Sequence, residues 1–323
     1  MKILIIRFSS IGDIVLTSPL LRVLAESLPN AELHFLVKEK FEEVVRHNPY
    51  LKRIISFKRN ARECITELRR ERYDLVLDLQ HNMRSAFVKI ALGVRSTSFK
   101  KLNIKKWVFV HFKRNLMPHT HIVDRYFATA RALPIKNDGK GLDFFHGEEG
   151  KMDLSALGLE MGKYHILVAG GSYFTKRIPI EKMKEIIRQT NLKMVIVGGL
   201  DDIAAGNAME GIFPGKVISL CGKTTLLQSA YIIKNADSVV TGDTGLMHIA
   251  AAYKKRIFSI WGNTLPEFGM YPYLPGVDSQ IIENKNLKCR PCSKLGHHKC
   301  PEKHFKCMQD LDFSNLFLKV SNL

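Results

Sequence analysis

The stretch "VVTGDTGLMHIAAA", residues 239–252, passes from an apolar run through a short polar turn into a helix-forming run. The apolar residues predict a buried strand that ends at Gly242, and Asp243 or Thr244 can cap the helix that follows. The same alternation of apolar strands and helical stretches recurs along the chain in two sets. Near-continuous apolar strands separated by helices are typical of parallel sheets covered on both faces. The sequence therefore predicts an α/β protein with two Rossmann-like domains.

The two sets are separated by a stretch rich in Gly, Asp and Lys at 133–153. We therefore expect an N-terminal domain over 1–150 and a C-terminal domain over 151–305. Residues 94–123 form a basic segment without the βα pattern, and 306–323 are expected to form a helix that packs toward the N-terminal domain. The expected strands are KILIIRF (2–8), AELHFLV (31–37), RIISF (53–57), YDLVLDLQ (73–80), YHILVAGG (164–171), KMVIVGG (193–199), VISLCG (217–222), SVVTGD (238–243) and RIFSIWG (256–262).

The chain has 323 residues, enough to bury a sizeable core, and 49 Lys and Arg against 31 Asp and Glu give a net charge of +18. That excess favours an anionic partner, such as nucleic acid, an anionic membrane surface or a phosphorylated substrate. No stretch approaches about 18 consecutive apolar residues, so no membrane span is expected. Arg7 interrupts the short apolar start, which predicts a first buried strand rather than a signal peptide. We expect a cytoplasmic protein.

A second strand in the C-terminal half also ends in glycines, in "VAGGSYFTKRIPIEKM", residues 168–183. Ser172, Thr175 and Lys176 follow this strand, and hydroxyls and a lysine at the carboxyl end of a strand are suitable diphosphate ligands. A solvated basic loop is the alternative interpretation of the same residues.

The other polar turns of this half are expected at the same sheet edge. The strand in "VIVGGLDD" is followed by Asp201 and Asp202, where a ribose hydroxyl can be held. In the 239–252 stretch, Gly245 permits close approach of a ligand, and the free N–H groups of the helix start suit phosphate oxygens. His248 can face the same crevice, although a packed histidine in a capped helix explains it equally well.

Three motifs, taken in order along the chain, resemble a known family. "SSIGD" (9–13), "TKRIP" (175–179) and "GDTGLMHIAAA" (242–252) are similar to the bacterial heptosyltransferases, the family 9 glycosyltransferases of lipopolysaccharide core assembly. "DLQHNMRSA" (78–86) also resembles the family, and the likeness extends from residue 1 to about residue 275. The resemblance implies a GT-B fold, in which two Rossmann-like domains face each other across a cleft.

The resemblance also implies roles for individual residues. Asp13 is implied as the general base on the acceptor hydroxyl, and Lys176 as the cation that neutralises the departing diphosphate. The donor is expected to be a nucleotide-diphosphate sugar, ADP-heptose in the best-known members. With a lysine and helix dipoles at the leaving group, no metal is required for an inverting displacement. The implied substrate-binding residues are Ser10, Gly12, Ser172, Thr175, Asp202, Asp243, Thr244, Gly245 and His248.

Asp13 also has a purely structural interpretation. It follows Gly12 at the start of a predicted helix, where an aspartate is a favourable N-cap. The two roles are compatible with each other.

A cysteine-rich segment, "CRPCSKLGHHKCPEKHFKC", lies near the end of the chain. A Cys-x2-Cys pair followed by two further cysteines is typical of structural zinc sites, although the second pair has an irregular spacing. Reduced thiols or disulfides are the alternative, and Cys64 and Cys221 are expected in the core. The candidate zinc ligands are Cys289, Cys292, Cys300 and Cys307, with His297, His298 and His304 as alternates.

A lipid-anchored acceptor would suit the positive charge, since anionic lipids line the inner face of the inner membrane. The basic run at 99–114, with Trp107 and Phe109 interleaved, can rest on that surface, or it can be an ordinary basic insertion. We therefore expect a peripheral location and no nucleic-acid partner. The competing hypotheses are a basic nucleic-acid-binding protein with a zinc knuckle, and a non-catalytic relative that binds nucleotide sugars.

Overall fold

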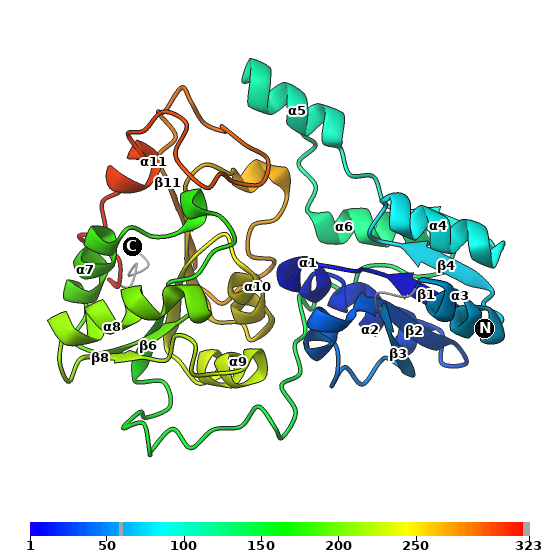
Figure 1. Ribbon diagram of the computed structural model, residues 1–323, viewed down its shortest axis with the longest axis horizontal. Coiled ribbons are helices and arrows are strands. Elements are labelled where there is room, and N and C mark those ends of the chain that lie inside the picture. The colour runs from blue at the N-terminus through cyan, green and yellow to red at the C-terminus, as the bar shows by residue number, and fades with distance from the viewer. Residues whose placement is uncertain (58–60, 319–323) are drawn as a thin grey trace. The chain divides into compact units, whose positions relative to one another are not determined.

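The computed structural model describes residues 1–57 and 61–318 and divides the chain into two compact units, each an α/β sheet with helices (Figure 1). The change from one set of strands to the other falls after Phe145. The N-terminal unit comprises Met1–Leu102 and Thr120–Phe145, and the C-terminal unit comprises Asn103–His119 and His146–Leu323.

The sheet of the N-terminal unit has five parallel strands in the order β3-β2-β1-β4-β5. The central strand β1 is apolar on both faces, and Ile3 pairs with Leu33 on one side and Leu75 on the other. The elements of this unit are β1 Lys2–Ile6, α1 Ile11–Val15, α2 Ser18–Ser27, β2 Glu32–Lys38, η1 Glu39–Val44, β3 Arg53–Phe57, α3 Ala61–Arg70, β4 Leu75–Asp78, α4 Met83–Leu92, β5 Ser96–Ser98, α6 Ile122–Phe127 and η2 Ala128–Ala130.

The sheet of the C-terminal unit has six parallel strands in the order β11-β10-β9-β6-β7-β8. Its elements are α5 Asn103–Phe112, β6 Tyr164–Val168, η3 Phe174–Lys176, α7 Ile180–Arg188, β7 Lys193–Val197, η4 Leu200–Asp202, α8 Ile203–Ile212, β8 Val217–Ser219, α9 Leu226–Lys234, β9 Ser238–Gly242, α10 Gly245–Ala252, β10 Arg256–Trp261, η5 Pro266–Phe268, β11 Gln280–Glu283 and α11 Lys306–Gln309. The predicted parallel α/β class is confirmed.

Both sheets reverse their strand order once. In the N-terminal sheet the reversal lies between β1 and β4, and in the C-terminal sheet it lies between β6 and β9. In open parallel sheets the loops after two such strands leave in opposite directions, and ligands bind at that point. The topology therefore marks the loops after β1 and β4, and those after β6 and β9, as the places to look for a site.

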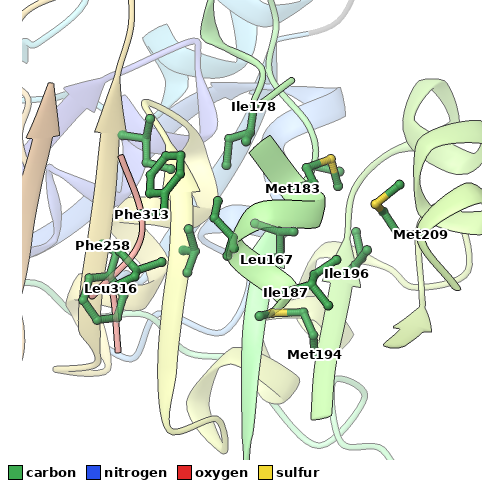
Figure 2. Packing of buried hydrophobic residues seen from close by; sticks show 14 of the residues in the cluster. Leu167, Ile178, Met183, Ile187, Met194, Ile196, Met209, Phe258, Phe313 and Leu316 are labelled. Atoms are coloured by element: carbon green, nitrogen blue, oxygen red, sulfur yellow. The ribbon is translucent and has the colours of Figure 1, made fainter. Parts of the chain in front are cut away.

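The core of the C-terminal unit also takes in the end of the chain. Figure 2 shows Leu167, Met194 and Ile196 from β6 and β7 packed in one cluster with side chains of α7 and α8. Phe313 and Leu316 belong to the same cluster. Residues 306–318 therefore pack on the C-terminal unit, because their apolar side chains complete this core. Beyond α11 the described part of the expected final helix consists of turns, and residues 319–323 lie outside the described residues.

Residues 94–123 differ from the expectation as well. They contain the helix α5, and residues 103–119 belong to the C-terminal unit although they interrupt the sequence of the N-terminal one. The ring of Phe109 packs on Phe268, and Lys113 Nζ donates to the backbone carbonyl oxygens of Cys289 and Pro291, which explains the assignment. Across the described ranges 1–57 and 61–318, no helix has the length and apolar character needed to span a bilayer.

Candidate functional site

Asp13 lies in the loop and short helix that follow β1, at the reversal point of the N-terminal sheet. Its Oδ2 accepts hydrogen bonds from the backbone N–H of Ser10 at 3.1 Å and from Ser10 Oγ at 2.8 Å. Ser10 is the N-cap of α1, and Asp13 is the third residue of the helix, which corrects the interpretation of Asp13 as the cap itself. Gly12 is buried between them in the first turn. The helix start thus orients the Asp13 carboxylate.

Arg7 holds the other oxygen of this carboxylate. Its Nη2 lies 2.6 Å from Asp13 Oδ1, and the side chains of both residues are largely buried. The guanidinium also donates to the backbone carbonyl oxygens of Ser9 and Leu79, the latter in the loop after β4. Arg7 therefore ties together the two loops at the reversal point and fixes Asp13 there.

The ion pair decides the protonation state of Asp13. Burial raises the pKa of this carboxyl group, but the positive charge of Arg7 and the two hydrogen bonds from Ser10 outweigh burial, so its pKa is lowered. Asp13 is therefore ionised at neutral pH and can accept a proton. The same contacts make it a weaker base than a free aspartate.

In the C-terminal unit, Lys176 and Asp243 meet at the reversal point between β6 and β9. Lys176 ends the short helix after β6, and its Nζ lies 2.6 Å from Oδ2 of Asp243, the first residue after β9. Thr264, which follows the neighbouring strand β10, donates from Oγ1 to the same oxygen at 3.1 Å. Three loops far apart in sequence thus converge on one ion pair, as the common edge of parallel strands predicts.

The close approach of these loops depends on a glycine. A Cβ atom at Gly242 would collide with the backbone carbonyl oxygen of Lys176. The glycine lets the loop that carries Lys176 lie directly against the end of β9.

The next residues form the start of α10. Thr244 is its N-cap and accepts from the backbone N–H of Met247 at 3.4 Å, while Gly245 is the first helical residue. His248 is buried in this helix. The capped helix start predicted from the sequence is present, and Asp243 serves the ion pair while Thr244 serves as the cap.

Asp202 and Asp201 are in different environments. Asp202 is buried, and its Oδ2 accepts from the backbone N–H of Gly199 at 2.9 Å. Its carboxylate lies against Gly170, where a Cβ atom would come within 2.7 Å of Oδ2. Asp201 and Ser172 are exposed. The Asp202 carboxylate therefore fastens the turns after β6 and β7 to each other, whereas the Asp201 carboxylate is open to solvent.

The cysteine-rich segment braces the loops of this site. Thr175, the residue before Lys176, donates from its backbone N–H to the carbonyl oxygen of His297 at 3.2 Å, and its hydroxyl accepts from the His297 N–H at 2.8 Å. Arg290 donates to the carbonyl oxygens of Trp261, Gly262 and Thr264 in the loop after β10. Residues 289–307 therefore support the loops that carry Lys176 and Thr264.

The thiols of this segment are in mixed environments. Burial raises the pKa of the Cys307 thiol to about 12, and burial also raises that of Cys292. Cys289 Sγ lies 4.0 Å from His304 Nε2. Within residues 1–57 and 61–318, no three His, Cys, Asp or Glu side chains are arranged to hold a metal ion, so structural zinc at Cys289, Cys292, Cys300 and Cys307 stays a prediction. Cys64 and Cys221 are buried, as expected.

With this geometry established, similarity to known proteins identifies the family. The sequence model of glycosyltransferase family 9 (heptosyltransferase) matches residues 61–304. The chain belongs to glycosyltransferase family 9. It is therefore a glycosyltransferase, and the predicted resemblance to this family is confirmed.

Curated relatives of this family 9 glycosyltransferase cover most of its length. It is 27% identical to lipopolysaccharide heptosyltransferase 1 of Campylobacter coli, over 82% of this chain and 84% of the relative. It is 24% identical to lipooligosaccharide heptosyltransferase 2 of Haemophilus influenzae, over 92% of this chain and 93% of the relative.

Solved structures agree in fold. A family 9 glycosyltransferase from Veillonella parvula superposes with a TM-score of 0.73 and 21% identity, covering 87% of this chain and 85% of that one. The ADP-heptose lipopolysaccharide heptosyltransferase II of E. coli gives a TM-score of 0.71 and 22% identity, covering 96% and 98% of the two chains. The GT-B class expected from the sequence is confirmed.

Three residues that hold the site together were not predicted from the sequence: Arg7, Thr264 and Arg290. Arg7 pairs with Asp13, Thr264 donates to Asp243, and Arg290 holds the loop that carries Thr264. Arg7 left a signal, because a charged residue at the end of an otherwise apolar strand is expensive to bury unless it is paired. Thr264 and Arg290 left none, since each acts through contacts that only the folded sheet brings together.

The contacts of Arg290 lead to a prediction for the stability of the C-terminal unit. Arg290 and Glu283 form an ion pair at 2.9 Å, with side chains only 3% and 6% exposed. Arg290→Gln should lower the free energy of unfolding of the C-terminal unit by about 3–5 kcal/mol, because the buried Glu283 carboxylate loses its close partner and keeps only the exposed Lys285 ammonium at 3.9 Å. Denaturant unfolding followed by circular dichroism measures this.

Two further variants sharpen the result. Arg290→Gln/Glu283→Gln should recover only part of the loss, because the carbonyl oxygens that Arg290 holds remain without their donor. Lys163→Gln, which removes an exposed ion pair with Glu160, should change little. Equal stability of the Arg290→Gln variant and the parent chain would contradict the assigned role.

Proposed function

We propose that this family 9 glycosyltransferase moves heptose from a nucleotide-diphosphate donor, ADP-heptose, onto a lipid-anchored lipopolysaccharide core acceptor. Its relatives are named lipopolysaccharide and lipooligosaccharide heptosyltransferases, and these names suggest the sugar and the class of acceptor. The observation that carries the proposal is the partly buried Lys176–Asp243 pair at the reversal point of the C-terminal sheet, next to the start of α10. A fixed cation beside a helix start supports diphosphate binding at this point.

On the donor side, Lys176 and the N–H groups at the start of α10 stabilise the negative charge that develops on the departing diphosphate. Asp243, itself held by Thr264, fixes the Lys176 ammonium in place. Because these groups already supply positive potential, the proposed reaction uses no catalytic metal. The remaining predicted donor contacts are Ser172, Thr175, Asp202, Thr244, Gly245 and His248.

On the acceptor side, Asp13 takes the proton of the attacking hydroxyl. The acceptor oxygen forms a bond to the anomeric carbon as the bond from that carbon to the diphosphate oxygen breaks, so one displacement inverts the configuration. Ser10 holds the carboxylate in position, and Gly12 leaves the first helical turn without a side chain. Arg7 keeps Asp13 ionised and ready to accept the proton.

Some predicted roles need a change of partner on binding. The Thr175 hydroxyl is bound to the backbone of His297, and the Asp202 carboxylate accepts from the Gly199 N–H. The exposed carboxylate of Asp201 is therefore the more accessible candidate for a ribose hydroxyl. Asp202 would act from behind it by shaping the turn.

The two competing hypotheses fare differently. A nucleic-acid-binding protein would leave both reversal-point sites without a role, and family membership argues against it. A non-catalytic relative that binds nucleotide sugars would keep the donor site, but that function does not explain why Arg7 holds Asp13 in its ionised state. The proposed location is peripheral, at the inner face of the inner membrane, where a lipid-anchored acceptor is reached.

Substitution of the base tests the proposal directly. Asp13→Asn should lower kcat on the order of 10²–10⁴-fold, because no group then accepts the proton, and should leave donor affinity unchanged. Lys176→Ala should lower kcat and weaken donor binding together. Transfer of heptose from ADP-heptose is measured by product mass, and donor binding by thermal shift across ADP-, UDP-, GDP- and dTDP-sugars.

Glu160→Gln, which changes an exposed carboxylate paired with Lys163, serves as the matched control and should behave like the parent chain. Transfer that survives Asp13→Asn would remove Asp13 as the base. A chain stabilised by none of the nucleotide sugars would overturn the proposed function.

The lowered pKa of Asp13 gives a separate prediction on pH. A carboxylate whose pKa is lowered stays ionised until the pH falls below the ordinary aspartate value of about 3.9. The kcat/KM of the parent chain should therefore show no acid limb from Asp13 between about pH 5 and 8. In Arg7→Gln the charge that lowers the pKa of Asp13 is gone while burial remains, so the acid limb should shift to a higher pH than in the parent chain.

Arg7→Lys, which keeps a cation near Asp13, should retain a flat profile. Circular dichroism of both variants checks that they fold. An unchanged pH profile in a folded Arg7→Gln variant would show that Arg7 does not control the protonation of Asp13.

Zinc at the cysteine-rich segment is a further proposal that rests on the spacing of the four cysteines. Metal analysis of the purified chain should then find about one zinc per chain, and Cys289→Ser/Cys292→Ser should lose it. Cys64→Ala, which changes a buried core thiol, is the control. A metal-free chain with freely titrating thiols would assign the segment to reduced cysteines, with Arg290 and His297 alone bracing the site.

A further inference from the structure

One part of the chain carries a concentration of positive charge. Residues 79–123, called the basic segment from here on, contain nine Lys and Arg and no Asp or Glu. This segment therefore supplies half of the net charge of +18 from 45 of 323 residues. The nine residues are Arg84, Lys89, Arg95, Lys100, Lys101, Lys105, Lys106, Lys113 and Arg114.

The first helix of the basic segment, α4, presents an apolar face to solvent. Met83, Phe87 and Ile90 are 90%, 51% and 80% exposed, at spacings of four and three residues that place them on one side of the helix. Ser85 and Val88 on another side are buried against the N-terminal unit. The side of α4 that contacts the N-terminal unit is therefore different from the side that carries the exposed apolar residues.

The second helix, α5, repeats the arrangement in the C-terminal unit. Ile104, Trp107 and Phe112 are 80%, 51% and 61% exposed, and the rings of Trp107 and Phe112 lie 5.5 Å apart. Phe109 faces the other way and packs on Phe268. Each helix thus has one face fixed to its own unit and an exposed face that combines large apolar side chains with nearby cations.

Such a combination restricts the partner. Large exposed apolar side chains on a soluble domain mark an interaction surface, and flanking Lys and Arg select an anionic one. Helices with an apolar face and basic flanks bury that face at the headgroup boundary of anionic bilayers. Nucleic acid would use the cations and Trp107, but it offers no apolar environment to Met83, Ile90 and Ile104.

We propose that the basic segment contacts the membrane through the helix that it contributes to each unit. The exposed side chains of α4 on the N-terminal unit, and separately those of α5 on the C-terminal unit, enter the headgroup–acyl boundary of an anionic bilayer, and the surrounding Lys and Arg side chains bind lipid phosphates. The inference rests on the proposed function in that a lipid-anchored acceptor is reached at such a surface. The exposures and charges that carry it are independent of the chemistry.

Vesicle flotation of the full chain tests the surface. The parent chain should bind vesicles of phosphatidylcholine with phosphatidylglycerol, bind those of phosphatidylcholine alone much more weakly, and lose binding at high salt. Met83→Ser/Phe87→Ser/Ile90→Ser, and separately Ile104→Ser/Trp107→Ser/Phe112→Ser, should each lower the partition coefficient at least about tenfold. Arg84→Gln/Arg95→Gln should lower partition to anionic vesicles roughly fivefold per charge removed.

The matched control is Met161→Ser/Val277→Ser, which removes two large exposed apolar side chains outside the basic segment. It should bind vesicles like the parent chain, and thermal unfolding should be similar for all variants because the changed side chains are exposed. Heptose transfer to a deacylated, soluble core acceptor should be unchanged in every variant, while transfer to acceptor embedded in anionic vesicles should fall with binding.

The outcomes separate the two proposals. Transfer to the soluble acceptor without any preference for anionic vesicles would overturn the membrane surface and leave the function standing. Vesicle binding that depends on α4 and α5, without transfer from any nucleotide sugar, would do the reverse. Binding to DNA or RNA that exceeds vesicle binding and is lost in the same variants would assign the surface to nucleic acid and overturn the inference.

Discussion

The parallel arrangement of the strands is the constraint on which the sites depend. Every strand of a parallel sheet ends at the same edge, and only at a reversal of strand order do two adjacent loops turn away from each other. Each unit has one such reversal, and each has an ion pair between polar residues of the loops there: Arg7–Asp13 in the first and Lys176–Asp243 in the second. These pairs thus lie where the backbone topology leaves room for ligands.

The two pairs have different physical consequences. In the first, the buried guanidinium of Arg7 lowers the pKa of the Asp13 carboxyl group. Asp13 therefore stays ionised, but it is a weaker base than a free aspartate. In the second, a carboxylate and a hydroxyl hold an ammonium in place, so the cation is already oriented before any anion arrives. The Asp13 carboxylate and the Lys176 ammonium are thus both held in place by neighbouring side chains.

The sequence predicted the parallel α/β class because its strands are apolar on both faces, and it singled out Asp13, Lys176 and Asp243 because their motifs follow those strands. It did not predict that Thr264 and Arg290 hold these residues, since they act across loops that are distant in sequence. The helix α5 was missed because its basic residues obscure the apolar periodicity. The sequence did not predict that the end of the chain completes the core of the C-terminal unit, because an amphipathic stretch does not reveal which core it joins.

The assignment of residues 103–119 to the C-terminal unit affects how the two units are connected. The chain passes from one unit to the other after residues 102, 119 and 145, so three backbone connections join them where a simple tandem arrangement would have one. No single cut yields two complete units, because a chain that ends at residue 145 retains both α5 and Lys113, which contacts the cysteine-rich segment of the C-terminal unit. Separate production of either unit therefore requires its two separate segments to be joined to each other.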